Sequence, residues 1–419
     1  MWNRFGAVLC ILLVLAATAT ADPFTISTST PAARKYQDGM AALRQGRLAD
    51  AERAFKESLT LEPRSSAPMV GLAQVALQKG DQSSANSYLK QALASAPESA
   101  QLQAVWGGFL YSRGDFKQAE AALLKAVSLE PKAAGSQASL GDLYLNAFQQ
   151  PAKAVEAYRA AVKVDPRHAG AHYGLGVALV LQGQANEGRD QLLEASKLAP
   201  QNPLPYYALG SVHAAQGRHS EALASLERAI KLQPRFPAAQ LERGNVLMAM
   251  NADDRALRAF SELPNAPEAQ VSIGMIHQRH GRWAEAEQAY LAAVRIEPRA
   301  AIAYNNLAWM AADRKVNLMK ALEWAQKAVA LDPKVPEFQG TLGWVYRAQG
   351  NLEKAEQTLR AAADVKPSRP AVVFTLARVY IERGKTALGA SEIKRALALD
   401  PQFPGADLAR KQLKDLGQS

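Results

Sequence analysis

The stretch that decides the fold is residues 201–234, QNPLPYYALGSVHAAQGRHSEALASLERAIKLQP. It holds two apolar segments, each with a small residue near its middle, Gly210 in the first and Ala222 in the second. Leu209 precedes the first small residue, and Leu226 follows the second by four positions. Only a small residue lets two antiparallel helices approach closely, so these four positions predict the seam of a helix pair. The final proline predicts the end of the second helix.

The same pattern recurs along most of the chain with a period of 34 residues. Prolines mark the period in three series: Pro63, Pro97, Pro131; Pro166, Pro200, Pro234; and Pro333, Pro367, Pro401. The small residue of the first helix is glycine or alanine in every copy: Gly39, Ala73, Gly107, Gly141, Gly176, Gly210, Gly244, Gly274, Ala308, Gly343 and Ala377. Eleven copies predict an all-α solenoid over residues 32–403, in which each pair buries its apolar face against its neighbours.

These repeated positions resemble the tetratricopeptide repeat (TPR) family. The resemblance implies a right-handed superhelix of helix–turn–helix repeats, whose first helices line a concave groove that holds extended peptides or helices of other proteins. Aromatic, Met and Arg side chains at the groove positions are typical of binding hot spots. These candidates are Tyr36, Tyr111, Tyr173, Tyr207, Asn245, Asn305, Trp309, Trp344, Arg347, Phe374 and Arg378, with Met40 and Met275 beside them. For the aromatic residues, half-buried packing is the alternative.

One known binding device of the family does not extend to this chain. Some members grip a C-terminal carboxylate with Lys and Asn at set groove positions of adjacent repeats. The corresponding Lys positions here carry Tyr36, Val70, Ala104 and Ala138. The resemblance therefore does not imply an adaptor for chaperone tails.

Three copies depart from the period. One residue is inserted around residues 146–151 and another around residues 313–320, and both are expected to lengthen the turn inside a pair. The seventh copy is about four residues short, since Pro264 follows soon after Phe260. Four residues are about one helical turn, which predicts a short second helix and a local change in the rise or angle of the solenoid. A tolerated deletion and a functional hinge are the two interpretations.

The last segment, residues 404–419, leaves the repeat pattern and predicts a helix that caps the open end of the array. Its apolar stripe consists of Ala406, Leu408, Ala409, Leu413 and Leu416.

The first 21 residues are typical of a secretory signal peptide. Arg4 precedes a ten-residue apolar run over residues 8–17, and Ala19-Thr20-Ala21 is typical of a cleavage site. The run is shorter than the roughly 20 residues of a spanning helix. We expect export and cleavage, followed by a flexible leader over residues 22–31; an uncleaved anchor is the alternative.

Composition argues against several classes of function. The single Cys among 419 residues excludes a disulfide framework, and a formal charge of +10 does not by itself predict nucleic-acid binding. His168 and His172 are four residues apart, but His168 falls in the turn between two repeats, and no His-Glu-x-x-His pattern is present. Neither a phosphate-binding glycine loop nor a nucleophile elbow is present. We therefore expect no catalytic, metal or cofactor site, no small-molecule substrate and no enzyme. Residues 216–419 carry 29 basic and 22 acidic side chains, a mildly basic half.

The leading functional prediction is a non-enzymatic scaffold for other proteins in the periplasm or at the cell surface of a bacterium. Residues 305–309 (NNLAW) and 341–344 (TLGW) are similar to paired segments of TPR proteins from exopolysaccharide and exosortase-linked systems. That similarity implies, as one alternative, a role in polysaccharide assembly or export, with envelope polysaccharide machinery as the partner. A periplasmic holdase or assembly factor for exported proteins is the other alternative.

Overall fold

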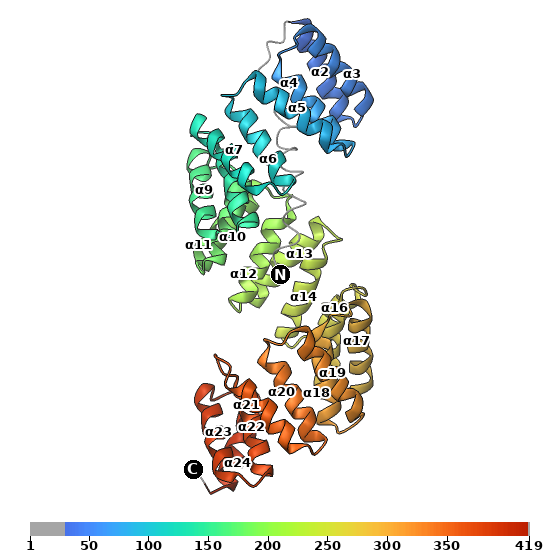
Figure 1. The fold of residues 1–419 in the computed structure, drawn as a ribbon, viewed down its shortest axis with the longest axis vertical. Coiled ribbons are helices and arrows are strands. Elements are labelled where there is room, and N and C mark those ends of the chain that lie inside the picture. The colour runs from blue at the N-terminus through green and yellow to red at the C-terminus, as the bar shows by residue number, and fades with distance from the viewer. Residues whose placement is uncertain (1–29, 418–419) are drawn as a thin grey trace. The chain divides into compact units, whose positions relative to one another are not determined.

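The computed structural model describes residues 30–417, which form 23 α-helices and one π-helix without any β-strand (Figure 1). The all-α prediction is confirmed. Helices alternate between a first and a second member of eleven pairs. The first helices are α2 (Pro31–Arg44), α4 (Ser66–Gln78), α6 (Ala100–Ser112), α8 (Ala134–Asp142), α10 (Ala169–Leu181), α12 (Pro203–Ala215), α14 (Pro237–Ala249), α16 (Pro267–Arg279), α18 (Ala301–Asp313), α20 (Pro336–Ala348) and α22 (Pro370–Glu382).

Each first helix packs against the second helix that follows it in the chain. The second helices are α3 (Leu48–Leu61), α5 (Gln82–Ser95), α7 (Phe116–Leu129), α9 (Pro151–Val164), α11 (Ala185–Leu198), α13 (His219–Leu232), α15 (Asp253–Ser261), α17 (Trp283–Ile296), α19 (Leu318–Leu331), α21 (Leu352–Ala363) and α23 (Thr386–Leu399). A final helix, α24 (Ala406–Asp415), follows the last pair.

The small residues lie where the helices of a pair approach most closely. A Cβ atom added to Gly210 would lie 2.6 Å from Cγ of Leu226, and one added to Gly244 would lie 2.3 Å from Cε1 of Phe260. Both distances are far below van der Waals contact, so the missing Cβ is what admits the large side chain of the second helix. The repeated small residue is thus a packing requirement of the seam.

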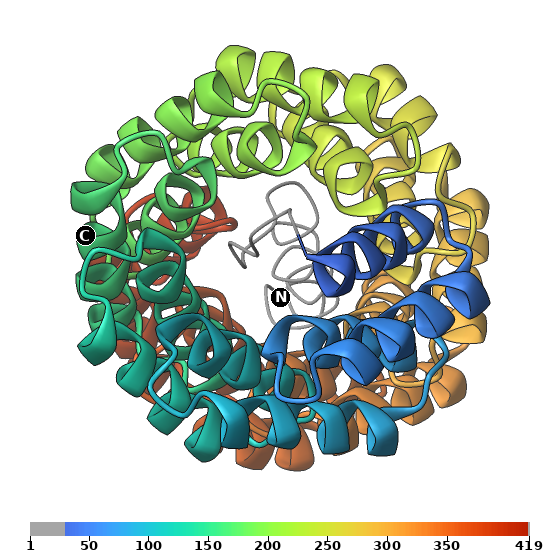
Figure 2. The same cartoon turned by 90° about the horizontal axis from the view of Figure 1, so that it is seen from above.

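The chain divides into two compact units, unit 1 ending at Pro234 and unit 2 beginning at Arg235. Within each unit, several consecutive first helices contact one another, as α8 and α10 do in unit 1 and α18, α20 and α22 do in unit 2. Consecutive second helices in the described residues make fewer direct contacts. Helices on the inner side of a curved stack lie closer together, so the first helices form the inner layer of each unit. Figure 2 shows the inner and outer layers of helices.

The first insertion does not lengthen a turn, contrary to the sequence expectation. Its extra residue is taken up by the π-helix η1 (Leu143–Ala147), which continues α8 before a turn of ordinary length. The backbone N–H of Phe148 donates to the carbonyl of Leu143, five residues back, at 3.2 Å. A π-turn accommodates one more residue than an α-turn, so the helix absorbs the insertion and the pairing with α9 is kept.

The second insertion does lengthen the turn of its pair. Four residues, 314–317, separate α18 from α19, whereas three residues, 182–184, separate α10 from α11. The turn of the fifth pair contains Gly183 at a φ of +82°. In the lengthened turn, Lys315 and Asn317 adopt the left-handed conformation in its place.

The seventh pair has a short second helix, since α15 spans nine residues against fourteen in α13. At the C-terminal end, α24 buries Ala406 and Ala409, and Leu413 and Leu416 pack partly against the same cluster. Leu408, expected in the apolar stripe, is exposed instead, because two residues correspond to about 200° on a helix and place it opposite the buried Ala406.

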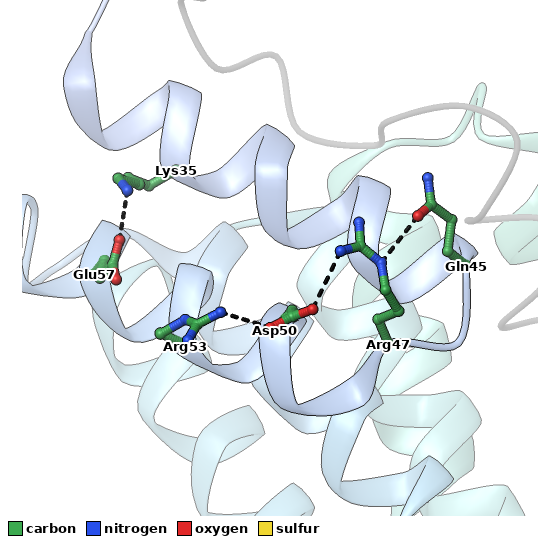
Figure 3. Close-up of polar contacts among 6 residues, drawn as sticks. All are labelled: Lys35, Gln45, Arg47, Asp50, Arg53 and Glu57. Carbon is green, nitrogen blue, oxygen red and sulfur yellow. Dashed lines mark hydrogen bonds and ion pairs between the residues drawn. The ribbon is translucent and has the colours of Figure 1, made fainter.

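The surface of the first pair carries a set of exposed polar contacts (Figure 3). Lys35 on α2 lies 2.6 Å from Glu57 on α3, and Asp50 accepts from both Arg47 and Arg53. The contact between Lys35 and Glu57 raises the pKa of the lysine and lowers the pKa of the glutamate. Solvent screens such exposed pairs, so the stability of the pair comes mainly from its buried seam.

Candidate functional site

Three consecutive first helices of unit 2 present side chains at one equivalent position. Trp309 on α18, Trp344 on α20 and Arg378 on α22 each follow directly after the small residue of their helix. Since α18 contacts α20 and α20 contacts α22, these side chains lie on neighbouring helices of the inner layer. With Arg347 and Glu382 they form what we call the Trp344 cluster.

Two guanidinium groups lie against the indole of Trp344. The Cζ atoms of Arg347 and Arg378 are each 4.6 Å from the centre of the ring, a distance at which the negative face of an aromatic ring attracts a cation. Nε of Arg347 donates to both carboxylate oxygens of Glu382, at 2.8 and 2.9 Å. This ion pair joins α20 to α22 and fixes one of the two arginines.

Arg378 differs from Arg347 in having no acid at hydrogen-bond distance within residues 30–417. Its side chain is half-buried. Burial first, and the Arg347 guanidinium second, lower the pKa of Arg378, while Glu382 and Asp313 act in the opposite direction. The pKa of a guanidinium is so high that Arg378 keeps its charge at neutral pH.

Two further polar atoms near the cluster are buried without a hydrogen-bond partner in the described part of the chain. One is Nε1 of Trp344, and the other is Oδ1 of Asn305, one helical turn before Trp309 on α18. The amide of Asn305 donates to Oδ1 of Asn306 at 3.3 Å. Trp309 itself is 37% exposed. The face therefore combines an accessible aromatic surface with a guanidinium that binds no acid of the described residues. Such an arrangement suits a segment that is partly apolar and partly acidic.

The other predicted groove residues of unit 2 are more dispersed. Asn245 on α14 is half-buried, and its amide donates to Glu242 at 3.4 Å. Met275 on α16 is 42% exposed. Both lie on first helices, Asn245 two pairs and Met275 one pair before Trp309.

In unit 1, Tyr111, Tyr173 and Tyr207 lie half-buried on α6, α10 and α12. Tyr111 also contacts Phe116, with ring centres 5.7 Å apart. These tyrosines are on first helices, as the repeat spacing predicts.

Two of the predicted groove residues are buried in the core. Tyr36 is 2% exposed and packs on Phe55, with ring centres 5.8 Å apart. Phe374 is 6% exposed because Phe403, just before α24, covers it with ring centres 5.6 Å apart. Met40 is buried as well. These side chains stabilise the terminal pairs and are not available to a partner.

The structure adds two acidic residues that the sequence analysis did not select. Glu382 lies four residues after Arg378 on α22, a spacing that places both on one helix face. Asp142 directly follows Gly141, the position that Trp344 occupies in its own pair. Burial raises the pKa of Asp142 to about 6, although the hydroxyl of Tyr158 donates to it at 2.6 Å and acts to lower it. Their positions in the repeat could have been used to select both acids from the sequence.

Between residues 30 and 417 no group of three or more His, Cys, Asp or Glu side chains is placed to hold a metal ion. In the same range no helix is both long enough and apolar enough to cross a membrane.

Comparisons with known proteins identify the family. Two family models, both described as tetratricopeptide repeat, match the chain, one over residues 147–203, 207–270, 271–336 and 341–404 and the other over residues 42–105. The chain belongs to the tetratricopeptide repeat family. TPR proteins bind other proteins, so the chain is a protein–protein interaction scaffold, and neither model describes an enzyme family.

Several solved structures are similar to this chain. PilF of Pseudomonas aeruginosa is 20% identical, with a TM-score of 0.46 over 50% of this chain and 95% of that chain. The Cut9–Hcn1 hetero-tetramer of the APC/C is 14% identical, with a TM-score of 0.49 over 96% and 98%. Yeast Tom70 is 14% identical, with a TM-score of 0.49 over 93% and 96%. No curated protein matches the sequence.

Proposed function

We propose that this protein is an exported, non-enzymatic scaffold of the bacterial cell envelope, and that the Trp344 cluster binds a segment of its partner. The observation that carries the binding site is the cluster itself. Trp309 and Trp344 lie on neighbouring first helices, and two arginines lie against Trp344. Aromatic and Arg side chains dominate binding hot spots because they combine large contact area with directional contacts.

Export and the envelope location are supported by the sequence of residues 1–21, which lies outside the described residues. Cell fractionation followed by N-terminal sequencing tests this part. We expect the chain in the envelope fraction, beginning at Asp22. Intact chain that starts at Met1 and lies in the cytosol would contradict export.

In-cell crosslinking, affinity capture and mass spectrometry test the binding site. We expect a stoichiometric set of envelope proteins with the unmodified chain, and loss of at least one of them with the double variant Trp309→Ala, Trp344→Ala. Trp283→Ala is the matched control, because Trp283 lies at the start of the second helix α17, where Arg314 contacts its ring at 5.3 Å. Unchanged capture by the double variant would contradict binding at the cluster.

The same capture separates the specific roles. A polysaccharide synthase or export channel in the set would assign the scaffold to polysaccharide assembly or export. A broad, substoichiometric set of unrelated exported proteins would contradict a specific scaffold and favour a holdase.

A further inference from the structure

The two arginines of the Trp344 cluster lie against the same aromatic ring. Their electrostatic environments differ. Arg347 is bound to Glu382 through a bidentate contact, so its charge is compensated inside the protein. Arg378 lies on the same ring without an acid at hydrogen-bond distance in residues 30–417. The cluster therefore contains one compensated and one uncompensated guanidinium, held 4.6 Å from the same centroid.

Leaving Arg378 without an acid is unfavourable for the free protein. The side chain is half-buried, and both burial and the second guanidinium disfavour its charged form. Asp313 and Glu382 attract it from a distance, but Glu382 is already engaged with Arg347 and Asp313 is exposed at the end of α18. A carboxylate placed on Arg378 from outside would supply the charge-assisted hydrogen bond that no acid in residues 30–417 makes with it.

Exposed apolar side chains lie on the two first helices that precede α20. Trp309 and Ile302 on α18 are 37% and 57% exposed, and Met275 on α16 is 42% exposed. Large exposed side chains on one layer of helices are a surface that a partner can cover. The charge of unit 2, 26 basic against 20 acidic side chains, also favours an acidic occupant.

We propose that Arg378 binds the carboxylate of an acidic protein segment, with a large apolar side chain of the same segment lying on Trp309. This inference rests on the proposed function and specifies the partner's chemistry at the same cluster. Nucleic acid fits less well, because a polyanion is bound by several uncompensated cations and the cluster offers one.

Synthetic peptides test the inference on the full chain. The probes are fluorescein-labelled dodecapeptides with one Glu beside Leu or Phe, and matched peptides in which Gln replaces that Glu. Fluorescence anisotropy should show the Glu peptides binding about tenfold more tightly than their Gln partners, since the amide cannot form a charge-assisted bond. The difference should shrink as salt is raised.

Arg378→Met should abolish the preference for Glu, and Arg378→Lys should restore part of it. Arg314→Met is the matched control, because it also removes a guanidinium that lies over a tryptophan in unit 2, but that ring is Trp283 and not Trp344. Equal binding of Glu and Gln peptides, or no binding of either set, would overturn the inference. If Arg378→Met does not fold, as judged by circular dichroism, the Glu–Gln comparison on the unmodified chain still decides.

The capture experiment keeps the two proposals apart. Capture of partners that depends on Trp309 and Trp344, together with equal binding of Glu and Gln peptides, would support the proposed function. It would contradict only the proposal that Arg378 binds a carboxylate. If capture is unchanged by the tryptophan double variant, the proposed binding site itself fails.

Discussion

At the residue scale, Asp142 shows how burial affects the pKa of an acid on a first helix. It follows the small residue Gly141 on the inner layer, beside the start of the π-helix, and its carboxylate is desolvated. The hydroxyl of Tyr158 donates to it at 2.6 Å but does not offset the loss of water. The folded protein therefore binds the proton of Asp142 more tightly than the unfolded chain does.

We predict that Asp142 makes unit 1 less stable as the pH rises. Its folded pKa of about 6 is above the ordinary value of 3.8, so its contribution is most favourable below pH 4 and is lost as the pH rises through 6. A shift of this size corresponds to at most about 3 kcal/mol. Asp142→Asn should reduce the fall in urea midpoint between pH 4.5 and 7.5, measured by circular dichroism.

Asp81→Asn is a control of opposite sign for that experiment. Hydrogen bonds from Ser84 lower the pKa of Asp81, so its contribution is present at neutral pH and is lost on acidification. An unchanged pH dependence in Asp142→Asn would show that the carboxylate is as well solvated in the folded protein as in the unfolded chain.

At the scale of the elements, successive pairs are linked by polar contacts from the end of a first helix back to the preceding second helix. Buried Glu356 on α21 accepts from Arg383 at 2.7 Å and from Lys385 at 2.8 Å, both just after α22. Asp253 on α15 accepts in the same way from Arg279, at 3.0 Å. These contacts lie at the ends of the first helices. They give fixed hydrogen-bond geometry to the interfaces between successive pairs, which are otherwise mainly apolar.

The close packing inside a helix pair predicts the cost of replacing its small residue. In Gly210→Ala, the new Cβ would lie 2.6 Å from Cγ of Leu226, and the helices would have to separate. We expect a loss of about 1–3 kcal/mol of unfolding free energy. Gly135→Ala is the matched control in α8, where a new Cβ meets no atom within 4 Å. It should be neutral or stabilise by up to about 1 kcal/mol through helix propensity.

Chemical denaturation of the two variants measures the difference. Equal midpoints for Gly210→Ala and Gly135→Ala would mean that the seam can relax around the added methyl group. That result would remove the packing reason for the small residue at this position.

The sequence predicts these elements well because the repeat is imposed by local packing. The spacing of Gly210, Ala222 and Leu226 is enough to place both helices and their seam. It could not predict where the insertion near residue 147 goes, because a π-turn and a longer turn both accommodate one residue. That choice depends on packing against α9, which spacing alone does not describe.

The candidate site was predictable only in part. Spacing places Trp309, Trp344 and Arg378 on one layer, since each follows a seam residue. It does not show that Phe374 lies beneath Phe403, because burial there depends on a segment outside the repeat. It also does not show that Glu382, on the same helix as Arg378, bonds instead to Arg347 on α20.

At the scale of the whole molecule, stability is shared only between neighbours. Every extensive contact between described helices joins elements that are adjacent or nearly adjacent in the chain. A repeat array of this kind behaves as a chain of nearest-neighbour couplings, in which damage to one pair spreads over a short range. The Trp344 cluster in unit 2 should therefore be independent of a defect at the beginning of unit 1.

Phe55→Ala tests this independence. Phe55 is fully buried between α2 and α4, and a Cβ added to either Gly39 or Gly71 would lie 2.6 Å from its ring. Its removal leaves a cavity that costs about 3–5 kcal/mol locally. Hydrogen exchange should speed up in α2 to α5 and remain unchanged in α18 to α22, with peptide binding at Trp344 preserved. Leu61→Ala is the control, because Leu61 lies exposed on the same helix as Phe55. Faster exchange in α20 and α22 would show that the chain unfolds as one cooperative block and that the couplings extend far beyond adjacent pairs.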